Sequence, residues 1–259
     1  MKALVLAAGR GERLRPLTDN SPKPLLEAGG RPLIHYALLL LRRAGVTEVA
    51  INLHHLGDRL RSTLGDGSAL DMSITYSPEP VLLGTGGPLP GLREYFAGEP
   101  FIVMNSDTII DLDLTRVIEF HRNQRALATF VLRKLVKPDV YSELEVDADG
   151  RLIAMRLLVD RAPKRIAEYR PPGASSDLQA AAHCMFCGIS ICEPVVLDLP
   201  APPPPFSLMG DLFAPALAAG RPLAAYLHSG YFRTVDDLAG YETIAREFKA
   251  MPPALAYLG

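Results

Sequence analysis

The sequence lacks several features that would assign a function directly. It has no tryptophan, and no apolar run approaches the about 20 residues that a membrane-spanning helix needs. Its formal net charge is −2, so no overall positive field attracts nucleic acid or an anionic membrane. The 48% hydrophobic and 22% charged content is that of a globular protein. We therefore expect no nucleic-acid and no membrane partner, and any anion binding must come from a local cluster.

Cysteine is also scarce, and all of it lies in the segment AHCMFCGISIC. Beside Cys184, Cys187 and Cys192 only His183 is of a zinc-ligand type, too few partners for a tetrahedral zinc site. The surrounding residues are apolar, which favours buried free thiols on a strand. The odd cysteine count and the lack of a secretory signal pattern at the N-terminus predict a reducing, cytoplasmic location.

Strand-like and helix-like segments alternate in the first part of the chain. Apolar patterns predict strands at 2–8, 46–54, 71–79 and 99–107, and amphipathic patterns predict helices at 33–44, 56–64 and 89–96. This alternation indicates βαβ units, hence a Rossmann-like three-layer α/β/α sandwich with a mainly parallel mixed sheet. Ligands of such sheets bind beyond the carboxyl ends of the strands, where residues 9–24, 83–88 and 105–107 should converge.

The second part of the chain is less regular. Strands are predicted at 127–135, 142–158 and 181–192, with a hairpin turn at 147–150, and helices at 208–219 and 237–248. Residues 160–178 are polar and contain proline and glycine, which predicts a loop. The segment APPPPF at 201–206 is typical of a rigid surface spacer.

The segment LVLAAGRGERLRPLTDNSPKPLL, residues 4–26, runs from an apolar strand into a loop rich in glycine and cations. Free backbone N–H groups beyond a strand can bind an anion. Arg10, Arg13, Arg15 and Lys23 add positive charge, and the prolines on both sides of Lys23 restrict its backbone. The composition predicts a phosphate site.

This loop differs from the common phosphate-binding motifs. A Walker A loop needs Ser or Thr after its lysine, whereas proline flanks Lys23 on both sides. A dinucleotide fingerprint needs a third glycine, and Leu14 stands in its place. A nicotinamide-dependent oxidoreductase is therefore disfavoured.

The pattern LxLAAGxGxRLxPLTxxxPKPLL resembles the signature of the sugar-1-phosphate nucleotidyltransferases, also called nucleotide-sugar pyrophosphorylases. The resemblance extends to YSPEPVLLGTGGPL, FIVMNSDTI and FCGISI, and is close over residues 1–115. Within the family, the chain is most similar to mannose-1-phosphate guanylyltransferase-like and N-acetylmuramate-1-phosphate uridylyltransferase-like proteins.

This resemblance implies an activity. Members transfer a nucleoside monophosphate from a nucleoside triphosphate to a sugar 1-phosphate, with Mg²⁺, and give an NDP-sugar and pyrophosphate. GTP or UTP is favoured on resemblance alone. It also implies a single domain over 1–259, with a nucleotide-binding half over about 1–115, a sugar-binding half over about 116–259, and no C-terminal β-helix. The oligomeric state stays open, a homodimer included.

The resemblance also implies site residues. Arg13 would hold the outer phosphates, Lys23 would neutralise charge at the reacting phosphates, and Asp107 would bind Mg²⁺. The residues implied in nucleotide binding are Leu6, Ala7, Ala8, Gly9, Gly11, Glu79, Gly84, Thr85 and Gly86. Those implied in substrate binding are Asn105, Glu143 and Gly188, with Glu168 an alternative to Glu143.

The second metal ligand is less direct. Many members carry an aspartate that aligns with Thr234 in GYFRTVDDLAGY, and a variant pattern places it at Asp236. A shift of two positions on an extended segment preserves the face, so Asp236 is preferred as the metal ligand, and Asp237, which could instead cap a helix, is the alternative. The shifted aspartate and a missing Glu-Lys-Pro motif favour one alternative, a non-catalytic regulatory homologue that binds nucleotide sugars.

Overall fold

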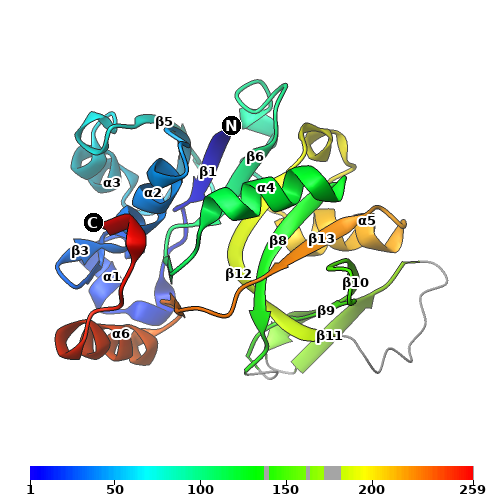
Figure 1. Cartoon of the computed structure of the whole chain (residues 1–259). Helices are drawn as coiled ribbons and strands as arrows, with labels where there is room; N and C mark the ends of the chain where they lie inside the picture. The colour runs from blue at the N-terminus through cyan, green and yellow to red at the C-terminus, as the bar shows by residue number, and fades with distance from the viewer. Residues whose placement is uncertain (137–139, 162–163, 172–181, 259) are drawn as a thin grey trace. The chain divides into compact units, whose positions relative to one another are not determined.

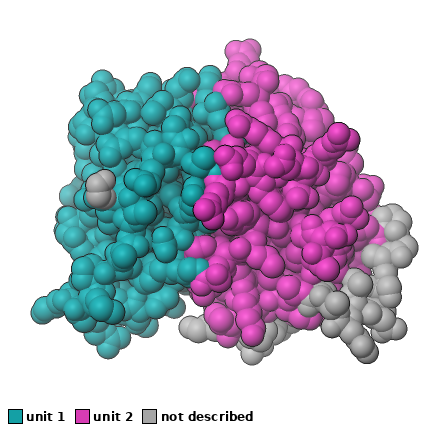
Figure 2. Space-filling model, in the orientation of Figure 1, with its two compact units in different colours: residues 1–82, 101–115, 230–259 teal, residues 83–100, 116–229 magenta. Residues whose placement is uncertain are grey.

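The computed structural model of the protein describes residues 1–136, 140–161, 164–171 and 182–258. The chain forms two compact units (Figure 2). Unit 1 contains Met1–Leu82, Phe101–Thr115 and Gly230–Gly259, and unit 2 contains Leu83–Pro100 and Arg116–Ser229. The predicted division near residue 115 therefore differs from these units, because residues 83–100 belong to unit 2 and the C-terminal segment belongs to unit 1.

Parallel strands form the centre of unit 1 (Figure 1). They pair in the order β6 (Phe101–Asn105), β1 (Lys2–Leu6), β4 (Glu48–Leu53) and β5 (Ser73–Pro78). Helix α2 (Leu33–Arg43) lies between β1 and β4 in the chain, and α3 (Gly57–Leu64) lies between β4 and β5. The middle of β1 is fully buried, which explains its continuous apolar run. The predicted strands and βαβ order of this part are confirmed.

Short elements complete unit 1. The loop after β1 holds η1 (Glu12–Leu14), α1 (Leu17–Asn20) and η2 (Lys23–Leu25), followed by the β2 (Glu27–Ala28) and β3 (Arg31–Pro32) pair. The remaining elements are η3 (Ser68–Leu70), β7 (Thr108–Ile110), β14 (Phe232–Thr234), α6 (Leu238–Ala250) and η7 (Ala256–Leu258). The C-terminal segment is part of the unit's core, since the ring of Phe248 packs edge-on against Tyr36 with centroids 5.8 Å apart.

Unit 2 is built on a mixed sheet. Its strands pair in the order β11 (Lys164–Tyr169), β10 (Leu152–Arg161), β9 (Glu143–Val146), β12 (Ala182–Cys192), β8 (Ala128–Lys134) and β13 (Leu223–Leu227). Only β8 and β13 among these pairs are parallel. Other elements are η4 (Pro90–Leu92), η5 (Pro194–Asp198), the π-helix η6 (Leu208–Phe213) and α5 (Ala214–Ala218). Helix α4 (Leu114–Gln124) begins in unit 1 and continues into unit 2.

Several predictions for unit 2 need correction. The loop predicted over 160–178 is wrong at Lys164–Tyr169, which forms the edge strand β11, while residues 162–163 and 172–178 lie outside the described residues. The helix predicted over 89–96 is wrong except for the single turn η4, because proline and glycine occupy that turn. The hairpin turn at 147–150 is confirmed, since it joins β9 to β10.

The cysteine prediction is confirmed. Cys184, Cys187 and Cys192 are free and buried. Burial raises the pKa of the Cys187 and Cys192 thiols to about 12, so both stay protonated and unreactive near neutral pH. The spacer at 201–206 is exposed over its first residues, but Phe206 is buried. Every helix in the described part of the chain is too short or too polar to cross a bilayer.

A buried histidine couples α4 to the sheet of unit 2. The side chain of His121 is fully buried, with Nδ1 2.8 Å from the Thr129 hydroxyl and Nε2 3.3 Å from a Glu193 carboxylate oxygen. Burial lowers the pKa of His121, and Glu193 opposes this effect. The folded protein therefore takes up this proton at a lower pH than the unfolded chain does.

We expect the free energy of unfolding to decrease as the pH falls below the ordinary histidine pKa of about 6.5, because protonation of His121 favours the unfolded chain. His121→Gln removes the titrating group and should flatten this dependence. Denaturant unfolding at about pH 7.5 and about pH 5 measures the difference. His183→Gln, at a largely exposed histidine, is the control. Equal slopes for the wild type and His121→Gln would contradict the assignment.

Candidate functional site

The loop after β1 presents backbone donors beyond the carboxyl end of the strand. Among the described residues, the N–H groups of Ala8, Gly9, Arg10 and Gly11 donate to no acceptor. Gly11 has a φ of 63°, and a Cβ there would lie 2.8 Å from Thr18 Cγ2. The loop therefore needs glycine at this position to form. Consecutive unpaired amides at a strand end make an anion-binding concavity.

Packing around Gly9 is different. A Cβ added to Gly9 would meet no protein atom within 4 Å, and Gly9 has no left-handed backbone. Neither strain nor crowding therefore requires glycine at this position. The space beside the Gly9 backbone is therefore open to a ligand.

Lys23 and Asp107 meet in unit 1 although they are 84 residues apart in the chain. Pro22 precedes η2 with an extended backbone, and the Lys23 ammonium donates a hydrogen bond to Oδ2 of Asp107. Their side chains are 18% and 12% exposed. Ser106 N–H donates to the Leu6 carbonyl at 3.2 Å, which keeps the Asp107 turn beside the end of β1. The cation and the carboxylate predicted from separate motifs thus form one centre.

The C-terminal segment brings a second carboxylate toward this centre. Strands β7 and β14 are antiparallel, with Thr108 opposite Thr234. Asp107 precedes Thr108 and Asp236 follows Thr234, so both aspartates leave the same end of this ladder. The Arg13 guanidinium lies 3.8 Å from Asp236 Oδ1. Arg13 and Asp236, both predicted as site residues, are therefore in contact.

The backbone also distinguishes Asp236 from Asp237. Val235 is fully buried, whereas Thr234 and Asp236 are partly exposed, as expected for an extended segment in which Thr234 and Asp236 share a face. Asp237 Oδ1 accepts a hydrogen bond from Gly240 N–H at 2.8 Å and caps α6. The cap role of Asp237 is confirmed.

Asn52 and Glu79 form a buried polar pair at the start of the loop, and the sequence predicted only Glu79 as a site residue. Glu79, predicted as nucleotide-binding, is 4% exposed and accepts a hydrogen bond from Asn52 Nδ2 at 2.8 Å. Asn52 is 2% exposed, and its Oδ1 accepts from Ala7 N–H at 2.7 Å. Asn52 was missed, although an amide near the end of the otherwise apolar strand AINL is a usable signal.

The glycine-rich turn of unit 2 packs against Phe206. Gly86 N–H donates to the Phe206 carbonyl at 3.0 Å, and a Cβ on Gly86 would lie 2.3 Å from the Phe206 ring. Gly84 has a φ of 79° and also lies against the Phe206 backbone. The Thr85 hydroxyl accepts from Leu208 N–H at 2.8 Å. Internal packing therefore accounts for residues that the resemblance assigns to nucleotide binding.

The implied sugar-side residues of unit 2 likewise have structural roles. Glu143 accepts from Arg156 at 3.4 Å and pairs with His183. Arg156 also pairs with Glu168 at 3.3 Å, so neither glutamate is available without breaking an ion pair. Gly188 has a φ of 78° where the register of β12 against β8 shifts, which favours glycine whether or not a ligand binds.

The structure thus divides the predicted site residues between the units. Unit 1 holds the following set: Leu6, Ala7, Ala8, Gly9, Gly11, Arg13, Lys23, Glu79, Asn105, Asp107 and Asp236. Leu6 and Asn105 are partners in the last register pair of β1 and β6. Unit 2 holds Gly84, Thr85, Gly86, Glu143 and Gly188.

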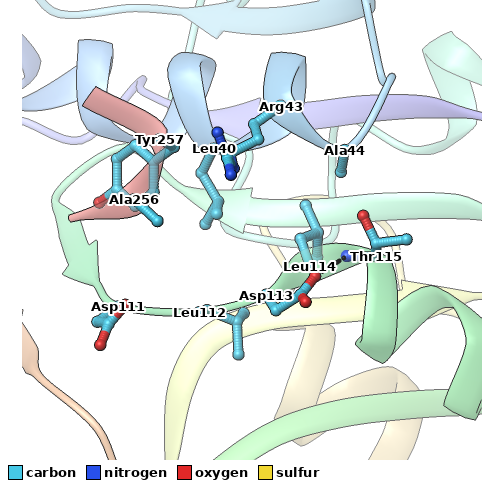
Figure 3. A pocket seen from close by; sticks show the side chains of 10 residues that line it. All are labelled: Leu40, Arg43, Ala44, Asp111, Leu112, Asp113, Leu114, Thr115, Ala256 and Tyr257. Carbon is cyan, nitrogen blue, oxygen red and sulfur yellow. Dashed lines mark hydrogen bonds between the residues drawn. The ribbon is translucent and has the colours of Figure 1, made fainter. Parts of the chain in front are cut away.

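A separate cavity of about 500 Å³ in unit 1 contains none of these residues. Figure 3 shows its lining from the end of α2, the segment after β7 and the C-terminal turn, including Arg43, Asp111 and Tyr257. Asp113 there accepts a hydrogen bond from Thr115 N–H at 3.1 Å. This cavity lies beyond Ile110, at the opposite end of β7 from Asp107.

Parallel strands that end in a glycine-rich anion loop define an α/β protein of the nucleotide-binding class. The model of the nucleotidyl transferase family matches residues 2–156, and the chain belongs to this family.

Comparisons with individual proteins agree with this assignment. Over 120 residues the chain is 49% identical to N-acetylmuramate alpha-1-phosphate uridylyltransferase of Neisseria meningitidis, covering 46% of this chain and 52% of that protein. It is 30% identical over 266 residues to the mannose-1-phosphate guanylyltransferase catalytic subunit beta of Dictyostelium discoideum, covering 100% of this chain and 68% of the relative. The chain spans about half to two-thirds of the length of the curated relatives it matches.

Solved structures show the same fold. A Bacillus anthracis protein described as a glucose-1-phosphate thymidylyltransferase matches with a TM-score of 0.74 at 20% identity, covering 100% of this chain and 99% of that chain. This likeness confirms the predicted Rossmann-like α/β/α fold.

We expect Asp237→Ala to lower the free energy of unfolding by about 1 kcal/mol, because α6 loses its capping acceptor. Asp236→Ala should cost less, because a partly exposed pair with Arg13 contributes about 0–1 kcal/mol. Urea denaturation of both variants checks the order. A larger loss for Asp236→Ala would show that Asp236, rather than Asp237, has the structural role.

Proposed function

We propose that this protein transfers a nucleoside monophosphate from a nucleoside triphosphate to a sugar 1-phosphate, releasing pyrophosphate and an NDP-sugar. The observation that carries the proposal is the contact of Lys23 with Asp107 beside a loop of unpaired backbone amides. Relatives named as uridylyl- and guanylyltransferases favour UTP or GTP as the donor. A short chain of phosphates is the ligand that such donors and cations fit.

The chemistry requires positioning more than proton transfer. A phosphate oxygen of the sugar 1-phosphate attacks the α-phosphorus, and the bond to pyrophosphate breaks. Because the nucleophile is already an anion, no general base is needed. The protein lowers the barrier by orienting the two phosphates and stabilising charge that develops between them.

Each group of the unit 1 site has a role in this reaction. The amides of Ala8 to Gly11 donate to phosphate oxygens, and Arg13 holds the outer phosphates. Lys23 exchanges its Asp107 partner for an oxygen of the reacting phosphates. Glu79 would contact the nucleotide, and Asn105 would contact the sugar phosphate. For unit 2, the family resemblance alone supports nucleotide contacts by Gly84, Thr85 and Gly86 and sugar contacts by Glu143 and Gly188.

We further propose Mg²⁺ as the cofactor, bound by Asp107 and Asp236. The donor set fits, because hard carboxylate oxygens suit Mg²⁺, which takes one or two carboxylates together with substrate phosphates. No cluster of three or more potential metal ligands occurs among the described residues, so phosphates and water would complete the coordination. When bound, the ion neutralises phosphate charge. Lys23 and Arg13 pair with the two carboxylates.

The cysteines bear on the compartment. Free, buried thiols are compatible with a reducing compartment, and we propose that the enzyme acts in the cytoplasm.

Activity is tested directly with purified protein, Mg²⁺, each of ATP, CTP, GTP, TTP and UTP, and a panel of sugar 1-phosphates. We expect pyrophosphate release with GTP or UTP, and its loss when EDTA removes the metal. The panel also identifies the sugar and the base. Binding of nucleotide sugars without turnover across the whole panel would contradict the enzyme and favour a regulatory binding protein.

We expect Lys23→Ala and Asp107→Ala each to lower turnover by about 10²-fold or more, because each removes charge stabilisation at the reacting phosphates. Circular dichroism should show a retained fold. The matched control is Lys2→Ala, which removes a lysine that begins β1 and pairs with Glu48. Wild-type rates for Lys23→Ala, or an equal loss for Lys2→Ala, would contradict these roles.

We expect Gly9→Ala to weaken nucleoside triphosphate binding by about tenfold without loss of stability, because the added methyl group meets no protein atom and can obstruct only a ligand. Calorimetric titration and thermal unfolding measure the two effects. Gly91→Ala is the matched control, since that glycine also has open space around its Cβ position but lies in unit 2. Unchanged affinity in Gly9→Ala would show that no ligand approaches this backbone.

A further inference from the structure

One buried side chain connects the start of the amide loop to Glu79. Asn52 lies on β4, between β1 and β5, and reaches both neighbours through its amide group. Its Oδ1 accepts from Ala7 N–H at 2.7 Å, and its Nδ2 donates to Glu79 Oε1 at 2.8 Å. Both partners lie beyond the strands that carry them, in the direction of the carboxyl ends.

The orientation of this amide is fixed by chemistry. A backbone N–H only donates, so it requires the oxygen of Asn52, and a carboxylate only accepts, so it requires the nitrogen. Aspartate in this place would lack the donor, and leucine would lack both groups. An amide therefore provides both bonds at once.

The surroundings indicate that Asn52 has a specific purpose. Its neighbours on β4, Ile51 and Leu53, are buried and apolar, as expected for the interior of a parallel sheet. A buried amide is costly there unless every polar atom is paired. An apolar residue would pack as well inside the sheet. The hydrogen bonds to Ala7 and Glu79 are therefore what an asparagine provides at this position.

The register pairs of the sheet do not include Ala7. Those of β1 with β6 end at Leu6 and Asn105, and those of β1 with β4 end earlier, at Val5 and Ile51. The Asn52 side chain thus continues the connection between these strands after their backbone pairing has ended. Ala8 to Gly11, whose amides have no acceptor among the described residues, follow directly from this anchored position.

We propose that Asn52 is a positioning residue for the nucleoside triphosphate. Asn52 sets the starting direction of the amide loop and the orientation of Glu79 with one side chain, and its effect on the triphosphate rests on the function proposed above. Donors that are already oriented lose less entropy when the ligand binds. Loss of this anchor weakens triphosphate binding and leaves the sugar 1-phosphate unaffected.

Exchanging the donor and acceptor tests the inference. Asn52→Asp keeps an acceptor for Ala7 but places a second carboxylate against Glu79. We expect the KM for the preferred triphosphate to rise about tenfold while the KM for sugar 1-phosphate stays within about twofold. In Asn52→Asp/Glu79→Gln the amide of residue 79 can donate to the new carboxylate, which restores both bonds. The double variant should therefore come within about threefold of Glu79→Gln alone.

Two outcomes would overturn the proposal. One is an unchanged KM for the triphosphate in Asn52→Asp, and the other is a double variant no better than Asn52→Asp. Ile51→Val, a neighbouring core substitution on β4, is the control for stability, and it should lower thermal stability without changing either KM.

A measurement that needs no catalysis separates this inference from the proposed function. Asn52→Ser shortens the side chain, and we expect the Ala7 amide to exchange with solvent at least about tenfold faster in NMR hydrogen exchange. Equal exchange in Asn52→Ser and the wild type would overturn the anchor, whether or not the protein releases pyrophosphate. Faster exchange in a protein without turnover would retain the anchor and refute the proposed function alone.

Discussion

The contact between Lys23 and Asp107 is the interaction on which the site depends. Each side chain is largely removed from water, and an unpaired charge in such a place would be costly. The pair is acceptable because the charges neutralise each other. The same two side chains could also bind a phosphate, through Lys23, and a metal ion, through Asp107. Much of the surrounding structure serves this contact: prolines frame Lys23, and the Ser106 hydrogen bond to Leu6 holds the turn that carries Asp107.

Around this contact, the unit 1 site combines rigid and adaptable parts. The backbone of the loop is set by Gly11, whose left-handed conformation is incompatible with a side chain close to Thr18. Asn52 anchors the beginning of the loop to the interior of the sheet. The side chains of Arg10 and Arg13 are more than half exposed and their guanidinium groups lie 3.8 Å from their carboxylate partners, so they can reorient toward a ligand at little cost.

Local patterns made the centre of unit 1 predictable. The apolar run of β1, the proline-framed lysine and the strand-end Asp107 are each visible within a few residues of sequence. Features that depend on partners distant in the chain were not predictable. The importance of Asn52 depends on Ala7 and Glu79, which are 45 and 27 residues away from it. Strand β11 was missed for another reason: its sequence is polar, although its partner β10 directly precedes it. The GTGG turn is easily recognised in the sequence, but the reason for its glycines is not, since packing against Phe206 and contact with a ligand both favour glycine there.

The pairing of β7 with β14 has a consequence for biosynthesis. A ribosome delivers the amide loop, Lys23 and Asp107 early, whereas the strand that completes their surroundings emerges only after all of unit 2 has been made. Unit 2 is therefore complete and can fold while unit 1 still lacks its C-terminal segment. Premature termination anywhere before Gly230 would release a product without Asp236 and without the strand that pairs with β7.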